Sequence, residues 1–183
     1  MVMLLEKKYL YFGIFLVFLS FIAISGYNSI MQTPQTYNNE NISFQYTSDF
    51  QNSSKFPLLQ GDDDSSWANL ANFNSNITQV GIIVQKSSNN GSDIKTLGTE
   101  FTQDFKRYGD NIVSSSEITN PNGVNMWKIV HIAKDTNQSY LFYDAYFLQA
   151  NNVYFIQIVG YGEKESSAQK VADMVFNSTK VLK

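Results

Sequence analysis

Residues 140–160 read YLFYDAYFLQANNVYFIQIVG, and this stretch decides the fold because it predicts two strands joined by a tight turn. The segments Tyr140–Ala150 and Val153–Gly160 are rich in aromatic and β-branched residues, which suit the pleated surface of a sheet. Only Asn151-Asn152 separates them, and asparagine tolerates the positive φ that a two-residue hairpin turn requires. We therefore expect an antiparallel hairpin here.

Two more strands are expected immediately before this hairpin, at Ile112–Ile118 and Asn125–Lys134. The sequence Asn120-Pro121-Asn122-Gly123 between them is typical of a turn. Four strands that follow one another with short connections predict an antiparallel meander.

Helical spacing flanks the meander on both sides in the sequence. Apolar side chains recur every three or four residues over Ile94–Tyr108, with Ser92 or Asp93 as the expected N-cap and Gly109 placed to end the helix in the left-handed conformation. Gly98 inside this helix is expected to cost about 1 kcal/mol relative to alanine. The C-terminal segment predicts a second helix with one shared face, made of Ala168, Val171, Ala172, Val175 and Thr179.

The first strand of the domain is expected at Ile42–Tyr46, where apolar and polar side chains alternate. Residues 51–66 contain proline, glycine, serines and consecutive aspartates and predict a long loop, followed by strands at Trp67–Phe73 and Val80–Val84. Strands, a helix, a run of strands and a final helix predict an α+β fold, with helices packed on an antiparallel sheet.

The N-terminus carries an export signal. Residues 9–25 contain no charge, Lys7 and Lys8 precede them, and the positive-inside rule places residues 1–8 in the cytoplasm and the rest of the chain outside. Seventeen apolar residues favour a transmembrane signal-anchor, whereas Ala23-Ile24-Ser25 would also allow cleavage before Gly26 and secretion. A buried core helix is the weaker alternative. Residues 26–36 are expected to be a linker, and residues 37–183 an extracytoplasmic domain at the cell membrane.

Composition limits the function classes. The chain has no cysteine, which excludes disulfides and cysteine nucleophiles and favours an exported prokaryotic protein. A net charge of -3 gives no basic patch for a phosphate backbone, so nucleic acid is not an expected partner. We also expect no cofactor and no metal ion.

Several residues are candidates for a site, each with a structural alternative. An aromatic surface made of Tyr140, Tyr143, Tyr146 and Tyr154 could hold a sugar, a peptide or another protein, or these rings could simply stabilise the sheet. Residues of Asn-x-Ser/Thr triplets could carry glycans on an exported surface, namely Asn41, Asn52, Asn76, Asn90, Asn137 and Asn177.

Catalytic and ion-binding motifs are weak. His131 is the only histidine, and no Gly-x-Ser-x-Gly motif accompanies it, so a structural role is favoured over a catalytic triad. Asp62-Asp63-Asp64 could bind a hard cation but lacks the spacing of an EF-hand loop, so a solvated loop is favoured. Gly160-Tyr161-Gly162 is interpreted as a loop and not as a phosphate cradle.

The order of these elements resembles the PsbP-like family, over roughly residues 37–183. Asn41-Ile42-Ser43-Phe44-Gln45-Tyr46 is similar to the family's first strand, although Thr47 and Phe50 stand where that family usually has proline and tryptophan. Asn122-Gly123 before a strand, the tyrosine-rich strands and the closing helix through Phe176–Lys180 also agree. The resemblance is greatest to membrane-tethered archaeal members, and it implies an α/β/α sandwich with a non-enzymatic accessory or binding role.

Three functions follow from these observations. The favoured one is a non-catalytic, membrane-tethered accessory or binding domain, whose partner could be another envelope protein. The second is a structural component of the cell envelope. The third is a hydrolase, which would need a nucleophile, a base and an oxyanion site from a chain with one histidine and no cysteine.

Overall fold

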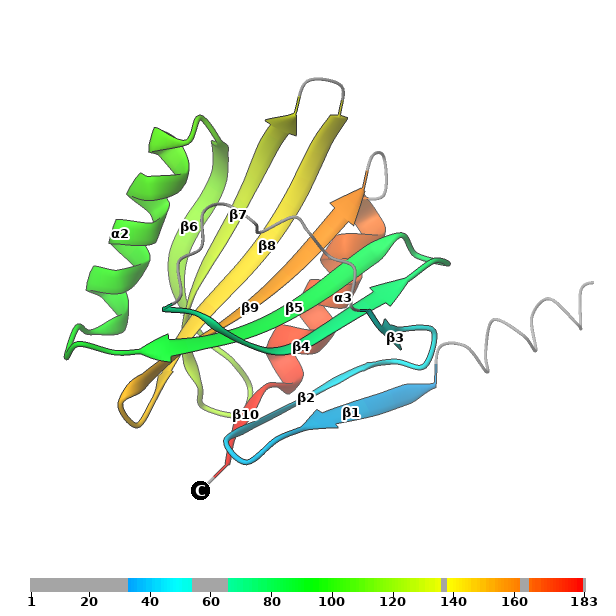
Figure 1. Ribbon diagram of the computed structural model, residues 1–183, viewed down its shortest axis with the longest axis horizontal. Coiled ribbons are helices and arrows are strands. Elements are labelled where there is room, and N and C mark those ends of the chain that lie inside the picture. The colour runs from blue at the N-terminus through cyan, green and yellow to red at the C-terminus, as the bar shows by residue number, and fades with distance from the viewer. Residues whose placement is uncertain (1–32, 54–65, 136–137, 162–164, 183) are drawn as a thin grey trace, which may run out of the picture.

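A computed structural model of the chain describes residues 33–53, 66–135, 138–161 and 165–182 (Figure 1). Its main layer is a seven-stranded sheet in which every neighbouring pair is antiparallel. In order across the sheet, the strands are β3 (Gln51–Asn52), β4 (Ala68–Ser75), β5 (Val80–Ser88), β9 (Asn152–Tyr161), β8 (Gln138–Gln149), β7 (Asn125–Asp135) and β6 (Asn111–Thr119). The expected meander is confirmed as β6-β7-β8-β9.

The central hairpin is confirmed, but its turn lies one residue earlier than expected. Gln149 pairs with Asn152, so Ala150 and Asn151 form the turn, and the positive φ of 53° falls on Ala150. An alanine takes this conformation because the paired strands on both sides fix the register, and that pairing outweighs the local preference for asparagine.

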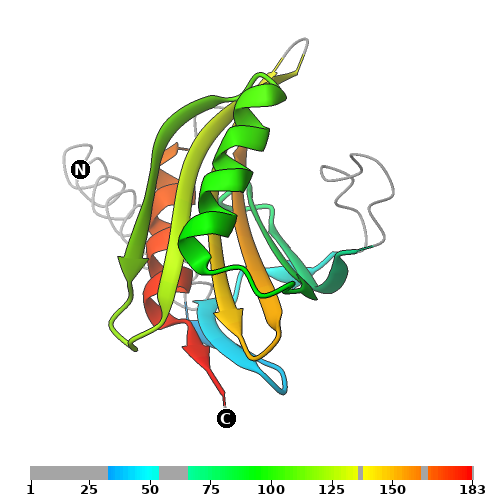
Figure 2. The same ribbon diagram turned by 90° about the vertical axis from the view of Figure 1, so that its left-hand side faces the viewer.

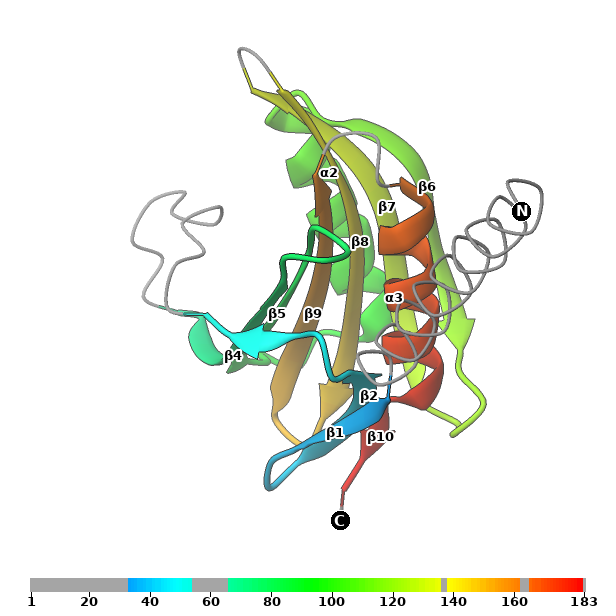
Figure 3. The same cartoon turned by 90° about the vertical axis from the view of Figure 1, so that its right-hand side faces the viewer.

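Two helices cover opposite faces of the sheet (Figures 2 and 3). Helix α2 (Ile94–Arg107) packs on β6, β7 and β8, and helix α3 (Glu165–Ser178) packs on β5, β8 and β9 and on strand β2 (Ile42–Thr47). The α2 boundaries follow the sequence signals: the Asp93 carboxylate accepts a hydrogen bond from the Thr96 amide at 2.7 Å, and Gly109 takes a φ of 90°. The α+β class is confirmed.

A second, smaller sheet joins the two ends of the domain. It has the order β1-β2-β10, with β1 at Pro34–Asn38 and β10 at Lys180–Val181. Strand β1 therefore begins inside the segment 26–36 that was expected to be a linker, because Gln35 and Thr36 pair with β2. Strand β3 likewise occupies the first two residues of the expected loop 51–66, since Gln51 and Asn52 pair with β4. Residues 54–65 lie outside the described part.

Each face of the main sheet has its own apolar core. The larger core lies between the sheet, α3 and the small sheet and includes Ile42, Phe44, Phe147, Ile156 and Phe176. The smaller one lies under α2, where Ile129, Tyr146, Val153 and Phe155 are buried beneath apolar side chains of the helix. Strands β8 and β9 are thus buried on both faces, which explains why residues 140–160 show an almost continuous apolar run.

The turn between β6 and β7 closes the end of α3. Asn120 is 6% exposed, and its amide nitrogen donates to the carbonyl oxygens of Phe176 and Thr179, both at 2.8 Å. Its side-chain oxygen accepts from the Asn122 and Val124 amides at 3.0 and 2.9 Å. One buried side chain therefore satisfies carbonyls that the helix end leaves free.

None of the helices among the described residues has the length and apolarity needed to cross a membrane. The apolar segment 9–25 lies outside these residues.

Candidate functional site

The four candidate tyrosines do not form one surface. Tyr143 and Tyr154 lie in the core on the α3 side and Tyr146 in the core under α2, and these three are 5%, 0% and 3% exposed. Tyr140 is half-buried near the start of β8. Side chains alternate between faces along a strand, so tyrosines at mixed parity on a sheet covered on both sides separate into two cores. The nearly continuous apolar run was the sequence signal for this arrangement.

Most of the candidate glycosylation asparagines are accessible. Asn41 is half-buried and Asn137 lies outside the described residues. The exposed members are Asn52, Asn76, Asn90 and Asn177.

The other weak motifs add no site. Asp62-Asp63-Asp64 and Gly162 lie outside the described residues, and Gly160 and Tyr161 are the last two residues of β9, not a loop. Gly160 pairs with Val80 and Leu141 inside the sheet. Within the described ranges, no group of three or more histidine, aspartate or glutamate side chains is arranged to hold a metal ion.

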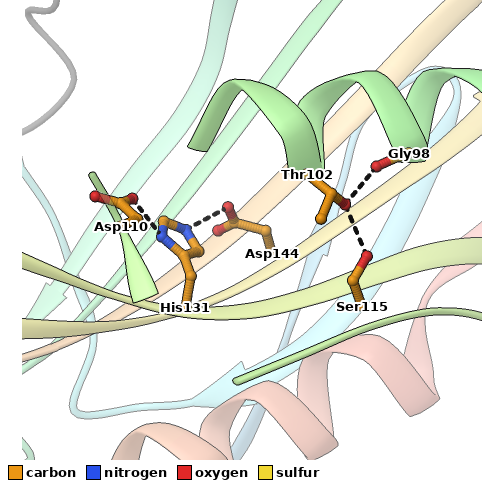
Figure 4. A network of polar contacts seen from close by, with 6 residues as sticks. All are labelled: Gly98, Thr102, Asp110, Ser115, His131 and Asp144. Atoms are coloured by element: carbon orange, nitrogen blue, oxygen red, sulfur yellow. Dashed lines mark hydrogen bonds and ion pairs between the residues drawn. The ribbon is translucent and has the colours of Figure 1, made fainter. Parts of the chain in front are cut away.

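His131 lies at the centre of a buried polar cluster (Figure 4). It sits on β7 and is 2% exposed, with its Nδ1 atom 2.7 Å from Asp110 Oδ2 and its Nε2 atom 3.0 Å from Asp144 Oδ2. The ring stacks between Phe105 of α2 and Phe142 of β8, at centroid distances of 4.0 and 4.9 Å. Residues 21 and 13 positions away in sequence thus hold both ring nitrogens, a contact that sequence spacing could not reveal.

The protonation of this cluster follows from its geometry. Burial lowers the pKa of His131, but the hydrogen bonds and negative charges of Asp144 and Asp110 outweigh burial and raise the pKa above its ordinary value. Burial raises the pKa of Asp144 as well, against the opposing effect of His131. The cluster therefore holds protons more tightly than the same groups would in water.

One side of the cluster has acceptors without donors. Asp144 is fully buried and pairs across the sheet with Gln157 of β9. Among the described residues, no hydrogen-bond donor reaches Asp144 Oδ1 or Gln157 Oε1. Unpaired buried acceptors are costly, so these two oxygens lower the stability of the cluster.

A second polar chain joins the middle of α2 to the sheet (Figure 4). The Trp127 indole donates to Ser115 Oγ at 2.8 Å, and Ser115 Oγ lies 2.7 Å from Thr102 Oγ1, which donates to the Gly98 carbonyl at 2.6 Å. Because Thr102 has a single hydroxyl proton, Ser115 is the donor between the two hydroxyls. Four groups are thus ordered in one direction, and they fix α2 close against β6 and β7.

The candidate binding site is a groove on the other face, which we call the α3 groove. Helix α3 makes most of its contacts with β2, β5, β8 and β9 and reaches β7 through Lys128, and β6 lies beyond it (Figure 3). The groove has a volume of about 400 Å³, within the range of small-ligand pockets. Its lining consists of Val113, Ser114, Lys128, Val130, Ile132, Ser139, Tyr140, Leu141, Tyr143 and Gln169.

Lys128 is the cationic group of the α3 groove. Its ammonium lies 5.7 Å from the centre of the Tyr143 ring, 5.9 Å from that of Phe176 and 3.9 Å from Asp173 Oδ1. The side chain is 25% exposed, so its charge is held over aromatic rings at the wall of a groove with mixed apolar and polar lining. A cation beside apolar strands suits a ligand or partner with an apolar part and an anionic group.

A second pocket of about 680 Å³ lies at the β6–β7 turn. It is lined mainly by the turn and by the chain end, where the Asn122 amide already donates to the carbonyls of Asn177 and Thr179 at 3.1 and 3.2 Å. The α3 groove has the firmer floor, because paired strands form it.

The fold has relatives among known structures. The solution structure of PsbP (CyanoP) from Synechocystis sp. PCC 6803 matches with a TM-score of 0.57 at 10% identity, covering 82% of this chain and 93% of that one. The fold is PsbP-like. LpqN of Mycobacterium tuberculosis, which is involved in cell envelope biogenesis, matches with a TM-score of 0.50 at 11% identity, covering 82% of this chain and 90% of its own.

The likeness lies in the fold alone, since a protein from Pseudomonas aeruginosa described as a putative regulator also shares it, at 6% identity and a TM-score of 0.50, covering 79% of this chain and 94% of that one. No protein-family model matches the sequence, and a search of curated proteins finds no match. The matches to known structures confirm the PsbP-like fold that the order of elements predicts.

Proposed function

We propose that the chain is a non-catalytic accessory or binding domain, tethered to the outer face of the cell membrane and acting through the α3 groove. The observation that carries this proposal is the groove itself, in which apolar side chains of β6, β7 and β8 lie beside α3 among serine and glutamine side chains, with the Lys128 ammonium at its wall. Such a surface can bind a ligand or an envelope partner without any chemical step.

The state of His131 supports a non-catalytic role. A general base needs a ring nitrogen that can reach a substrate, yet both nitrogens of this ring contact buried carboxylates. The histidine is therefore occupied in holding α2 to the sheet. The likeness of the fold to LpqN, a protein of cell envelope biogenesis, supports a place in the envelope.

Membrane tethering is tested through the topology of the full chain. We expect a reporter fused after Lys183 to be active only outside the cytoplasm, because Lys7 and Lys8 hold the N-terminus inside. Mass spectrometry of the protein from native membranes should find residues 9–25 retained. A mature protein whose N-terminal residue is Gly26 would show that the segment is cleaved and the domain secreted. Reporter activity in the cytoplasm would contradict the proposal.

The groove is tested by substitution at its rim. Val113 is 59% exposed and lines the α3 groove, so Val113→Asp should leave the fold intact and reduce by at least fivefold the yield of cross-links between the chain and its partner in native membranes. Ile77, 48% exposed in the β4–β5 turn, provides the matched control, since Ile77→Asp adds the same charge to an exposed apolar residue outside the groove. Equal cross-linking by both variants would contradict a role for the groove.

A structural role in the envelope is the second candidate. Strand β6 forms one edge of the main sheet, and a nine-residue edge can pair with another chain. The exposed Asn52, Asn76, Asn90 and Asn177 would carry glycans in such a layer. Cross-links that join only copies of this chain would favour this role over the accessory role.

A further inference from the structure

The two contacts of the His131 ring with carboxylates need one more proton than a neutral histidine carries. A neutral imidazole carries one N–H group, whereas both ring nitrogens here face a carboxylate oxygen, at 2.7 and 3.0 Å. With only one N–H, the second nitrogen would point its lone pair at a carboxylate. Both contacts are favourable only when the ring is an imidazolium or when a carboxylate carries the extra proton.

The groups that face His131 from each neighbouring element set the charge balance. Asp110 follows α2 and precedes β6, Asp144 and Tyr146 come from β8, and Gln157 comes from β9. Asp104 of α2 is about half exposed and pairs with Arg107 at 2.8 Å. In the state with an imidazolium, two carboxylates and one cation carry the charge inside the cluster. Burial raises the pKa of Tyr146 well above its ordinary value, so this phenol stays neutral.

Asp110 connects this charge to the end of α2. Its amide donates to the Phe105 carbonyl at 3.0 Å and its carboxylate binds the His131 ring, while Phe105 stacks on the same ring. The backbone and two side chains at the C-terminal end of α2 thus converge on one imidazole. The positive charge of an imidazolium also interacts favourably with the C-terminal end of α2, where the free carbonyl groups create a negative potential.

We propose that the proton on His131 controls the docking of the C-terminal end of α2 on the sheet. When the ring is an imidazolium, it holds Asp110 and the helix end in place. When the proton is lost, Asp110 and Asp144 remain beside a ring that can donate to only one of them, and the helix end is released. Release exposes Phe105 and the rings beneath it. The inference does not depend on the ligand of the α3 groove, which lies on the other face.

The direction of the pH effect is fixed by linkage. In the docked state Asp110 lies against the ring in addition to Asp144, and its charge and hydrogen bond raise the pKa of His131. The open state keeps only Asp144 beside the ring, so the docked state binds the proton more tightly than the open state. The docking energy is fully present below the pKa of the open state and is lost as pH rises through the pKa of the docked state. Between the two values the equilibrium constant for opening should rise about tenfold for each pH unit, since one proton is released.

The first test follows the histidine itself in the full chain in detergent micelles. His131 is the only histidine, so its ring gives one set of NMR signals. We expect both ring nitrogens to be protonated at pH 6.5 and the titration midpoint to lie above the value measured in urea. A midpoint at or below the urea value would overturn the proposal.

The second test measures amide exchange by mass spectrometry between pH 6 and 9, corrected for base catalysis. The Tyr108, Gly109 and Asp110 amides bond to carbonyls of α2 and report the helix end. Between the open-state and docked-state pKa values of His131 their opening should rise about tenfold per pH unit, whereas the α3 amides should not follow. A parallel rise in both helices would overturn the proposal, because the proton would then act on the whole domain.

Asp110→Asn is the matched variant, since an amide of the same shape can accept from a protonated ring or donate to a neutral one. We expect this variant to lose at least half of the pH dependence of exchange at the α2 end. Arg107→Gln, which removes an exposed charge from the same helix turn, should keep it. A wild-type pH slope in Asp110→Asn would contradict the role of this contact.

Discussion

Replacing His131 with alanine should lower the free energy of unfolding by about 3–5 kcal/mol, the range found when one partner of a buried ion pair is removed. The cost is large because Asp144 is fully buried and would lose its cationic partner, while the two stacked phenylalanine rings would border a void. Urea denaturation of the full chain, followed by circular dichroism, measures this loss.

The matched control for His131→Ala is a hydrogen-bonded ion pair on the surface. Arg107 and Asp104 are joined at 2.8 Å but are 75% and 47% exposed, so Arg107→Ala should cost no more than about 1 kcal/mol. Adding Asp144→Asn to His131→Ala should cost less than the sum of the single changes, because it removes one of the two remaining charges. A loss below about 1 kcal/mol for His131→Ala would show that the cluster does not stabilise the fold.

Replacing Gly98 with alanine should destabilise the domain by about 1–3 kcal/mol, even though alanine is the better helix former by about 1 kcal/mol. An added Cβ atom would lie 1.9 Å from Cγ of Trp127 and 2.2 Å from its Cδ2 atom. Helix α2 would have to move away from β7 and break the Trp127–Ser115–Thr102 chain. Thermal unfolding and the tryptophan emission maximum both measure this change.

Two further variants separate this contact from a general effect on the helix. Thr99 neighbours Gly98 but is exposed, so Thr99→Ala should change stability by less than about 0.5 kcal/mol. Gly98→Ala combined with Trp127→Leu, which makes room for the methyl group, should lose less than the two single variants added together. If Gly98→Ala were as stable as the original chain, the close contact between Gly98 of α2 and the Trp127 ring would be contradicted.

The structural role of Gly98 could not be predicted from the sequence. In the sequence, Gly98 is a helix residue that lowers helix stability relative to alanine. Only the position of the Trp127 ring shows that any larger residue at this position would destabilise the domain more. The candidate tyrosines give the same lesson in reverse. They suggested a common surface, yet Tyr143 and Tyr146 point to opposite cores because the sheet is covered on both faces.

The α3 groove and the small sheet could not be predicted from the sequence either. The α3 groove combines Val113, Lys128 and Gln169, whose strands and helix meet only in the folded domain. Strand β10 is two residues long and has no periodic signal of its own, and it forms because the end of α3 places Lys180 and Val181 beside β2.

The sequence by itself determined the elements: the β8–β9 hairpin, the ends of α2 with an N-cap at Ser92 or Asp93 and a stop at Gly109, and the antiparallel order of the meander. These depend on side-chain period and on backbone conformations set within a few residues, so local chemistry suffices. Only the tertiary structure decided which groups meet, above all that His131 lies between Asp110 and Asp144. Those contacts are the outcome of the packing of α2 against the sheet, which depends on the whole chain at once.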